Sequence, residues 1–93
     1  MEQNNFSLKG GFIMFRRKNY ITICVELEYM SDIFNLINNI DIYGTISEYL
    51  DGNKLYITFV TKTKTQKIVK FIESKLYKTE VMVFGNFIYL IME

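Results

Sequence analysis

The chain has 93 residues, of which 49% are hydrophobic and 16% aromatic, and its formal net charge is +1. This length suits one domain, and the apolar content excludes a wholly disordered chain. Histidine is absent and cysteine occurs once, which excludes an internal disulfide framework and removes the usual general base and the commonest transition-metal ligand. We therefore expect a non-enzymatic protein with no catalytic residues, no cofactor and no metal site.

No apolar run approaches the roughly 18 residues of a membrane-spanning helix, and no charged and then apolar leader opens the chain. We therefore expect a cytoplasmic protein that does not act on membranes. A single cysteine fits a reducing compartment. Cys24 lies in the middle of an expected strand, and without histidine it has no obvious activating partner, so we expect a structural thiol.

Residues 1–13 show no sustained hydrophobic period and are expected to form a flexible tail before a single domain over residues 14–93. The tripeptide Lys9-Gly10-Gly11 is compatible with the codons of a bacterial ribosome-binding sequence, and Met14 follows at about the usual spacing. We therefore hypothesise that natural translation starts at Met14. The alternative, an ordinary N-terminal tail, predicts the same flexibility for these residues.

The first half of the domain predicts a strand and a helix. Residues 19–29 alternate between apolar and polar side chains, which predicts a strand with one buried face. Ser31 followed by Asp32 is typical of a helix start. Apolar residues at i, i+3, i+4 and i+7 then predict a short amphipathic helix over residues 32–40.

The second half begins with a hairpin: strands over residues 44–50 and 54–61 flank the turn Asp51-Gly52-Asn53. Thr63 or Thr65 is expected to cap the next helix. Its inner face is formed by Ile68, Val69, Ile72 and Leu76.

A final apolar strand over residues 81–92 is interrupted by Gly85-Asn86. This pair is either a bulge in one long strand or the turn of a terminal hairpin, and we favour the hairpin slightly. The order strand, helix, strand, strand, helix, strand predicts an α+β, ferredoxin-like fold. It is a four-stranded antiparallel sheet with both helices on one face, the first and third strands central, and an extra C-terminal strand if the hairpin forms.

Residues Gly44–Gly52 resemble the acylphosphatase hairpin. That chemistry needs an Asn to orient water and an Arg in the loop before the first helix. Here Glu48 stands in the Asn position, and the loop Glu28–Ser31 has no cation. The resemblance therefore implies no acylphosphatase activity.

Residues Lys54–Val60 resemble the third-strand motif of RNA-recognition modules, which stack bases on central-strand aromatics. Tyr56 and Tyr20 can supply two such rings on the outer sheet face. Glu26 and Glu28 on the same expected face would repel a phosphate backbone, so this comparison does not favour RNA binding there.

The topology also resembles ACT-type regulatory domains, which pair with themselves and bind amino acids near the first strand-to-helix loop. Here that loop, Glu28–Asp32, lacks the family's Pro and Gly. Over Tyr20–Phe84 the chain is similar to short, uncharacterised bacterial domains with little beyond this unit. That similarity implies no activity. A small ligand held in a dimer groove near Tyr29–Asp32 is one open alternative.

Charge is unevenly distributed along the chain. Residues 62–78 contain six lysines and one glutamate, whereas residues 19–61 contain six acidic residues and one lysine. A lysine-rich helix face can neutralise phosphates, which gives a second alternative, a nucleic-acid-binding accessory protein. The residues expected to contact the anion are Arg16, Arg17, Lys18, Lys64, Lys67 and Lys70.

Residues 81–92 are apolar on both expected strand faces, and only one face can cover the helices. An apolar edge strand without proline or central charge aggregates unless it is paired. Our leading hypothesis is a non-enzymatic regulatory or protein-interaction module that acts as a homodimer or other homo-oligomer, joined by edge pairing or by stacking of the open sheet face. The residues expected to mediate this contact are Val83, Phe87, Ile88, Tyr89, Leu90 and Ile91.

Overall fold

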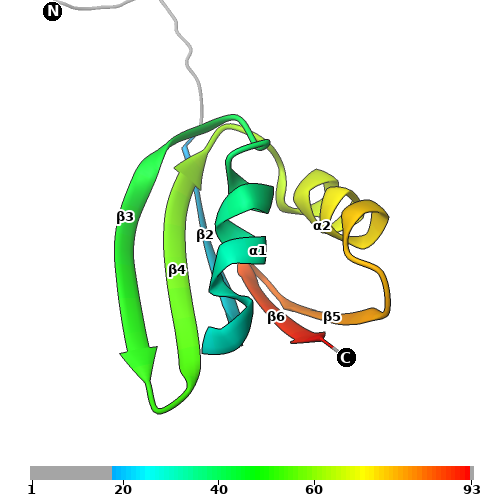
Figure 1. Ribbon diagram of the computed structural model, residues 1–93. Coiled ribbons are helices and arrows are strands. Elements are labelled where there is room, and N and C mark those ends of the chain that lie inside the picture. Colours follow the sequence, from blue (N-terminus) through cyan, green and yellow to red (C-terminus); the bar gives the residue numbers. More distant parts are fainter. Residues whose placement is uncertain (1–17, 93) are drawn as a thin grey trace, which may run out of the picture.

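The computed structural model describes residues 18–92 (Figure 1). The hypothesis about residues 1–13, and the predicted anion contacts of Arg16 and Arg17, lie outside the described residues. The elements in chain order are β2 (Asn19–Glu26), the 3-10 turn η2 (Leu27–Tyr29), α1 (Met30–Ile37), β3 (Ile42–Asp51), β4 (Lys54–Thr61), α2 (Thr65–Lys75), β5 (Thr79–Phe84) and β6 (Phe87–Met92).

The five strands form one sheet in the order β3-β4-β2-β6-β5, and both helices cover the same face of it (Figure 1). This α+β arrangement is consistent with a ferredoxin-like fold plus one extra C-terminal strand. The hairpin interpretation of Gly85-Asn86 is confirmed, since β5 and β6 pair antiparallel on either side of it.

One expectation about the sheet is wrong. Instead of a wholly antiparallel four-stranded sheet, the structure has a mixed sheet in which β6 runs parallel to β2. The hairpin folds back inward, so that β6 lies between β2 and β5 and the edge position goes to β5. Burial explains this choice, because Ile88 and Leu90 of β6 are completely or almost completely buried under the helices.

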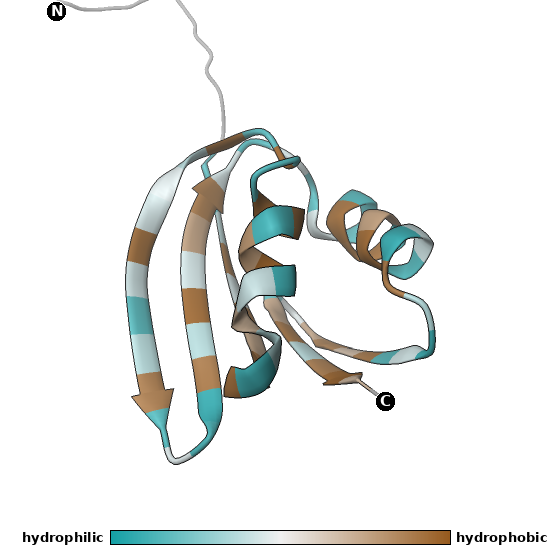
Figure 2. Ribbon diagram, viewed as in Figure 1, coloured by the Kyte–Doolittle hydropathy of each residue, from teal (hydrophilic) through white to brown (hydrophobic). Residues whose placement is uncertain are grey.

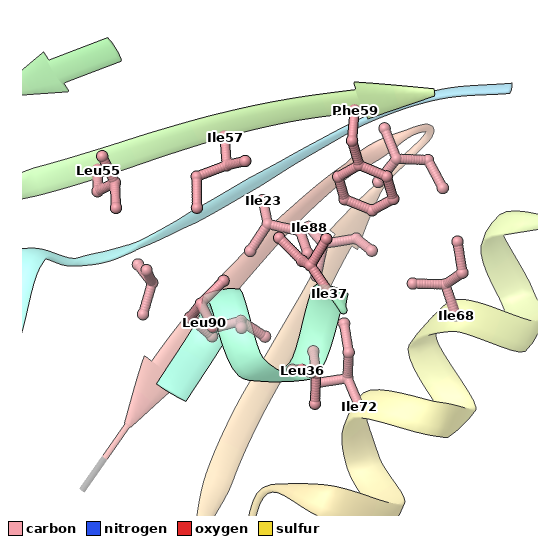
Figure 3. Close-up of a cluster of buried hydrophobic side chains, with 13 residues drawn as sticks. Ile23, Leu36, Ile37, Leu55, Ile57, Phe59, Ile68, Ile72, Ile88 and Leu90 are labelled. Carbon is pink, nitrogen blue, oxygen red and sulfur yellow. The ribbon is translucent and has the colours of Figure 1, made fainter. Parts of the chain in front are cut away.

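The core lies between the sheet and the two helices. Figure 3 shows side chains from β2, β4 and β6 meeting side chains from α1 and α2. The sheet supplies Ile21, Ile23, Val25, Leu55, Ile57, Phe59, Ile88 and Leu90, and the helices supply Ile33, Leu36, Ile37, Ile68 and Ile72.

Several element boundaries differ from expectation, among them those of the first strand and of the first helix, which spans Met30–Ile37 instead of residues 32–40. The first strand ends at Glu26, where Leu27 N–H donates to the carbonyl of Asn53 at 2.7 Å, and η2 follows it. Consequently α1 begins at Met30 with Tyr29 at the cap position, so Ser31 lies inside the helix and does not cap it.

The second helix also begins without the expected cap. Lys64 occupies the cap position of α2 and makes no capping hydrogen bond with its side chain. Thr63 N–H instead donates to the hydroxyl of Thr61, and the hydroxyl of Thr65 donates to Asn86. Both threonines therefore bind residues outside the first turn of α2.

Candidate functional site

The sheet face opposite the helices, here called the open face, carries the largest set of solvent-accessible aromatic side chains. Alternation along each strand puts core residues on one side and their neighbours on the other, and Figure 2 shows this alternation along β3 and β4. The open-face residues of the three inner strands are Tyr20, Thr22, Cys24 and Glu26 of β2, Lys54, Tyr56, Thr58 and Val60 of β4, and Phe87, Tyr89 and Ile91 of β6.

A row of aromatic rings crosses the open face from one sheet edge to the other. The ring centroids of Tyr49 and Tyr56 lie 5.9 Å apart, those of Tyr56 and Phe87 6.3 Å, and those of Phe87 and Phe84 6.5 Å. These separations lie within the range in which aromatic pairs attract one another. Tyr49 on β3 and Phe84 on β5 end the row, and Phe84 keeps 59% of its surface exposed.

Lys54 is a cation on the open face, and it lies next to the aromatic row. Its Nζ donates to the hydroxyl of Tyr89 at 2.9 Å and lies 5.3 Å from the centre of that ring. This hydrogen bond raises the pKa of Lys54. Because Glu26, Asp51 and Glu80 share the same end of the sheet by register, that end is acidic despite the lysine.

Cys24 lies at the centre of the open face, between Tyr56 and Tyr89 in the register of the neighbouring strands. It is only 2% exposed. Burial raises the pKa of its thiol, and this effect outweighs the opposing hydrogen bond with Tyr56 and the charge of Lys54. A thiol held in its protonated form is a poor nucleophile, in keeping with a structural role.

The structure separates the predicted self-association residues into three groups. Ile88 and Leu90 lie in the core of the same chain. Phe87, Tyr89 and Ile91 lie on the open face. The remaining residue, Val83, lies on the helix side of the sheet, beside α2.

Val83 pairs with Ile88 and lines a groove between α2 and β5 of about 530 Å³. Val69 of α2 contributes to the same groove, and the polar residues Thr65, Gln66, Lys70 and Glu73 complete the α2 side. This groove lies along the edge of the sheet, since β5 is an edge strand. The C-terminal hairpin therefore presents apolar surface on both of its faces.

A second, shallow groove of about 430 Å³ lies between the two helices. Its α1 side carries Asp32, Asn35 and Asn39, and its α2 side carries Phe71 and Lys75. Of the residues expected near a small ligand, Tyr29–Asp32, only Asp32 lines this groove. The small-ligand interpretation stays a prediction.

The predicted anion contacts lie away from the aromatic row. Lys64, Lys67 and Lys70 are exposed at and after the start of α2, which belongs to the helix layer on the other side of the sheet (Figure 1). Lys18 is exposed just before β2, with its Nζ 6.0 Å from the Tyr43 ring centre. The lysines of α2 and the aromatic row therefore lie on opposite sides of the sheet. A single nucleic-acid strand cannot contact these lysines and stack its bases on the open face at the same position.

A polar cluster that sequence reasoning missed joins three elements at one end of the sheet. The side-chain amide of Asn19 donates to the hydroxyl of Thr65 at 3.1 Å, Thr65 donates to Asn86 at 2.8 Å, and Asn86 donates back to Asn19 at 3.1 Å. The cluster ties the starts of β2 and α2 to the β5–β6 turn, and so fixes the position of the hairpin.

Comparison with known proteins gives no assignment: no family model, no curated protein and no solved structure matches this chain. Within residues 18–92, no three His, Cys, Asp or Glu side chains gather where they could hold a metal ion. In the same range, no helix has the length and apolar character needed to cross a membrane.

Proposed function

We propose that the protein is a non-enzymatic regulatory or interaction module that works as a homo-oligomer, with its C-terminal hairpin as the contact surface. The observation that carries this proposal is the exposure of apolar side chains on β5 and β6. Met82, Val83, Phe84 and Ile91 expose 37%, 43%, 59% and 38% of their surface, respectively, in the single chain.

This exposure is costly for an isolated chain. Complete burial of one large apolar side chain contributes about 1.5–3 kcal/mol. Met82, Phe84 and Ile91 lie on the open face of the hairpin, and Val83 lies on its helix side. A small domain also has a marginal core of its own. Covering the hairpin with a second copy removes this surface from water without requiring any further molecule.

The charge of the open face supports a protein partner for this side of the sheet. Glu26, Asp51 and Glu80 outnumber Lys54 at the end that the strands share. Such a rim repels phosphates and is compatible with an aromatic protein interface, in which charged residues lie at the periphery. The aromatic row therefore supports protein association more than nucleic-acid stacking.

The experiment is sedimentation equilibrium of the wild type and of Phe84→Ser. We expect the wild type to associate reversibly and Phe84→Ser to raise the dissociation constant at least about fivefold, because the exposed ring contributes on the order of 1 kcal/mol when it is covered. The matched control is Tyr77→Ser, since Tyr77 is more exposed still but lies in the α2–β5 loop. Equal association of all three proteins would refute the role of the hairpin.

A second proposal, that of a nucleic-acid-binding accessory protein, is favoured by one observation. Lys64, Lys67 and Lys70 are all exposed along α2, and cations that neutralise phosphates give an affinity that falls as salt rises. Fluorescence anisotropy with labelled single- and double-stranded oligonucleotides at low salt tests it. Binding that weakens steeply with salt and is lost in Lys64→Gln/Lys67→Gln/Lys70→Gln would support this function, and no binding at low salt would refute it.

A further inference from the structure

The two edges of the sheet differ in how well they can accept another strand. At one edge, β3 is irregular, because its pairing with β4 shifts between Ile42 and Gly44 and again between Thr45 and Ser47. Bulges of this kind protect an edge from further pairing. At the other edge, β5 pairs with β6 in unbroken register from Thr79 to Phe84, and it contains no proline and one charged residue, Glu80.

The hairpin turn determines which backbone groups of β5 point outward. Gly85, with φ +62°, and Asn86 form a two-residue turn between Phe84 and Phe87. In such a hairpin the flanking pair exchanges hydrogen bonds, and successive residues of an antiparallel strand alternate in direction. The amide and carbonyl groups of Val81 and Val83 therefore face away from β6, toward the free edge.

We propose that two copies of the chain join β5 to β5 in antiparallel orientation, with Met82 opposite Met82 on the two-fold axis. The inference rests on the proposed function, in that the partner is a second copy. In this register Val81 of each copy lies opposite Val83 of the other. Both residues have outward backbone groups, so the two pairs exchange four hydrogen bonds.

Side-chain chemistry agrees with this register on both faces. On the helix side, Val81 of the second copy comes to lie beside Val83, at the groove of about 530 Å³ whose apolar wall includes Val69. On the open face, the two Met82 side chains meet at the axis, and Glu80 lies opposite Phe84. Glu80 therefore packs its methylene groups on an aromatic ring, and the two glutamates stay apart.

The pairing also makes one sheet out of two. Ten strands would run without interruption from β3 of one copy to β3 of the other, and both bulged edges would lie at the outside. Further growth of the sheet is then blocked, which gives a closed two-fold dimer. A single strand pair buries less than the roughly 1,600 Å² of a standard interface, so we expect a dissociation constant in the micromolar range or weaker.

The test is disulfide trapping of Met82→Cys under mild oxidation. Directly opposed residues of a non-hydrogen-bonded antiparallel pair have Cα atoms about 4.5 Å apart, within the range that a disulfide spans. We expect a covalent dimer to form at least about tenfold faster than in the matched control Glu80→Cys, whose cysteines would be four residues out of register. The native Cys24 is present in both variants and is buried.

Two outcomes distinguish this inference from the proposed function. If light scattering shows a wild-type dimer but Met82→Cys traps no faster than Glu80→Cys, the register is wrong and self-association stands. If the wild type is a monomer at every concentration, both are wrong. Amide hydrogen exchange of the wild type gives a variant-free check, because exchange at Val81 and Val83 must slow as the concentration rises.

Discussion

Phe59 shows at the residue scale how the fold is held together. Its side chain is completely buried between the sheet and the helices, in contact with the cluster that includes Ile23 (Figure 3). Truncating such a side chain loses its transfer free energy and leaves a cavity. Tyr20, on the neighbouring strand, is by contrast mostly exposed.

We therefore expect Phe59→Ala to lower the free energy of unfolding by about 3–5 kcal/mol and Ile23→Val by about 0.5–1.5 kcal/mol. Tyr20→Ala is the control, with an expected loss of less than about 1 kcal/mol. Urea denaturation followed by circular dichroism measures all three. A loss for Phe59→Ala no greater than that for Tyr20→Ala would contradict this core.

The thiol of Cys24 gives a prediction about pH. Burial raises its pKa in the folded state, so as pH rises the unfolded chain loses this proton first. Ionisation then favours the unfolded state, and stability falls as pH rises above the ordinary pKa of a thiol. Tyr56 and Lys54 face the same thiol and only partly oppose the effect of burial.

We expect the free energy of unfolding to fall more steeply between pH 8 and pH 10 in the wild type than in Cys24→Ala. Urea titrations at the two pH values measure the difference. Parallel pH profiles for the two proteins would show that the thiol does not change its proton affinity on folding.

At the scale of elements, the loop between α2 and β5 contains a strained residue. Lys78 has φ +56°, a left-handed conformation that costs a residue with a Cβ atom about 1–2 kcal/mol. Glycine adopts it without that cost, although it loses more entropy on folding. The strained conformation of Lys78 lets the chain turn directly from α2 into the edge strand β5.

Lys78→Gly should accordingly raise the stability by up to about 1 kcal/mol, which corresponds to a melting temperature about 4–8 °C higher for a domain of this size. The matched control is Lys70→Gly, an exposed lysine inside α2, which should lower the stability by about 1 kcal/mol. Thermal denaturation of the two variants distinguishes them. A destabilised Lys78→Gly would mean that the left-handed conformation is not a source of strain.

Elements were predictable from sequence wherever the signal is local. Residues 54–61 form a strand with the predicted bounds, because alternation and the turn at Gly52 act over a few residues. The place of β6 was not predictable. β5 and β6 are both apolar, and which of them pairs with β2 depends on contacts with the helices and on the Asn19–Thr65–Asn86 cluster, whose members are distant in sequence.

The candidate site was predictable in composition but not in orientation. The sequence identified the C-terminal apolar surface, yet Ile88 and Leu90 face the core of their own chain while Phe87 and Ile91 face outward. The aromatic row was not predictable either. Tyr49 lies beside Tyr56, and Phe84 beside Phe87, because of the order and register of the strands. Alternation gives the two faces of a strand, and only the tertiary fold decides which face is buried.

For the whole molecule, one sheet with helices on a single side leaves its other side and its regular edge to be covered. A five-stranded sheet packed in this way exposes the aromatic row and the hairpin residues Met82, Val83 and Phe84. The bulges of β3 protect only the opposite edge. Under the proposed function, such a module would act through the partner that covers these surfaces, and we propose a second copy as the partner of β5.

The most direct measurement is the molar mass of the wild-type protein by light scattering, from low micromolar to millimolar concentration. The account predicts a reversible rise from the 11.1 kDa of one chain toward twice that mass, without further growth. A mass that stays at 11.1 kDa over the whole range would contradict it, because the exposed hairpin would then be stable in water without a partner.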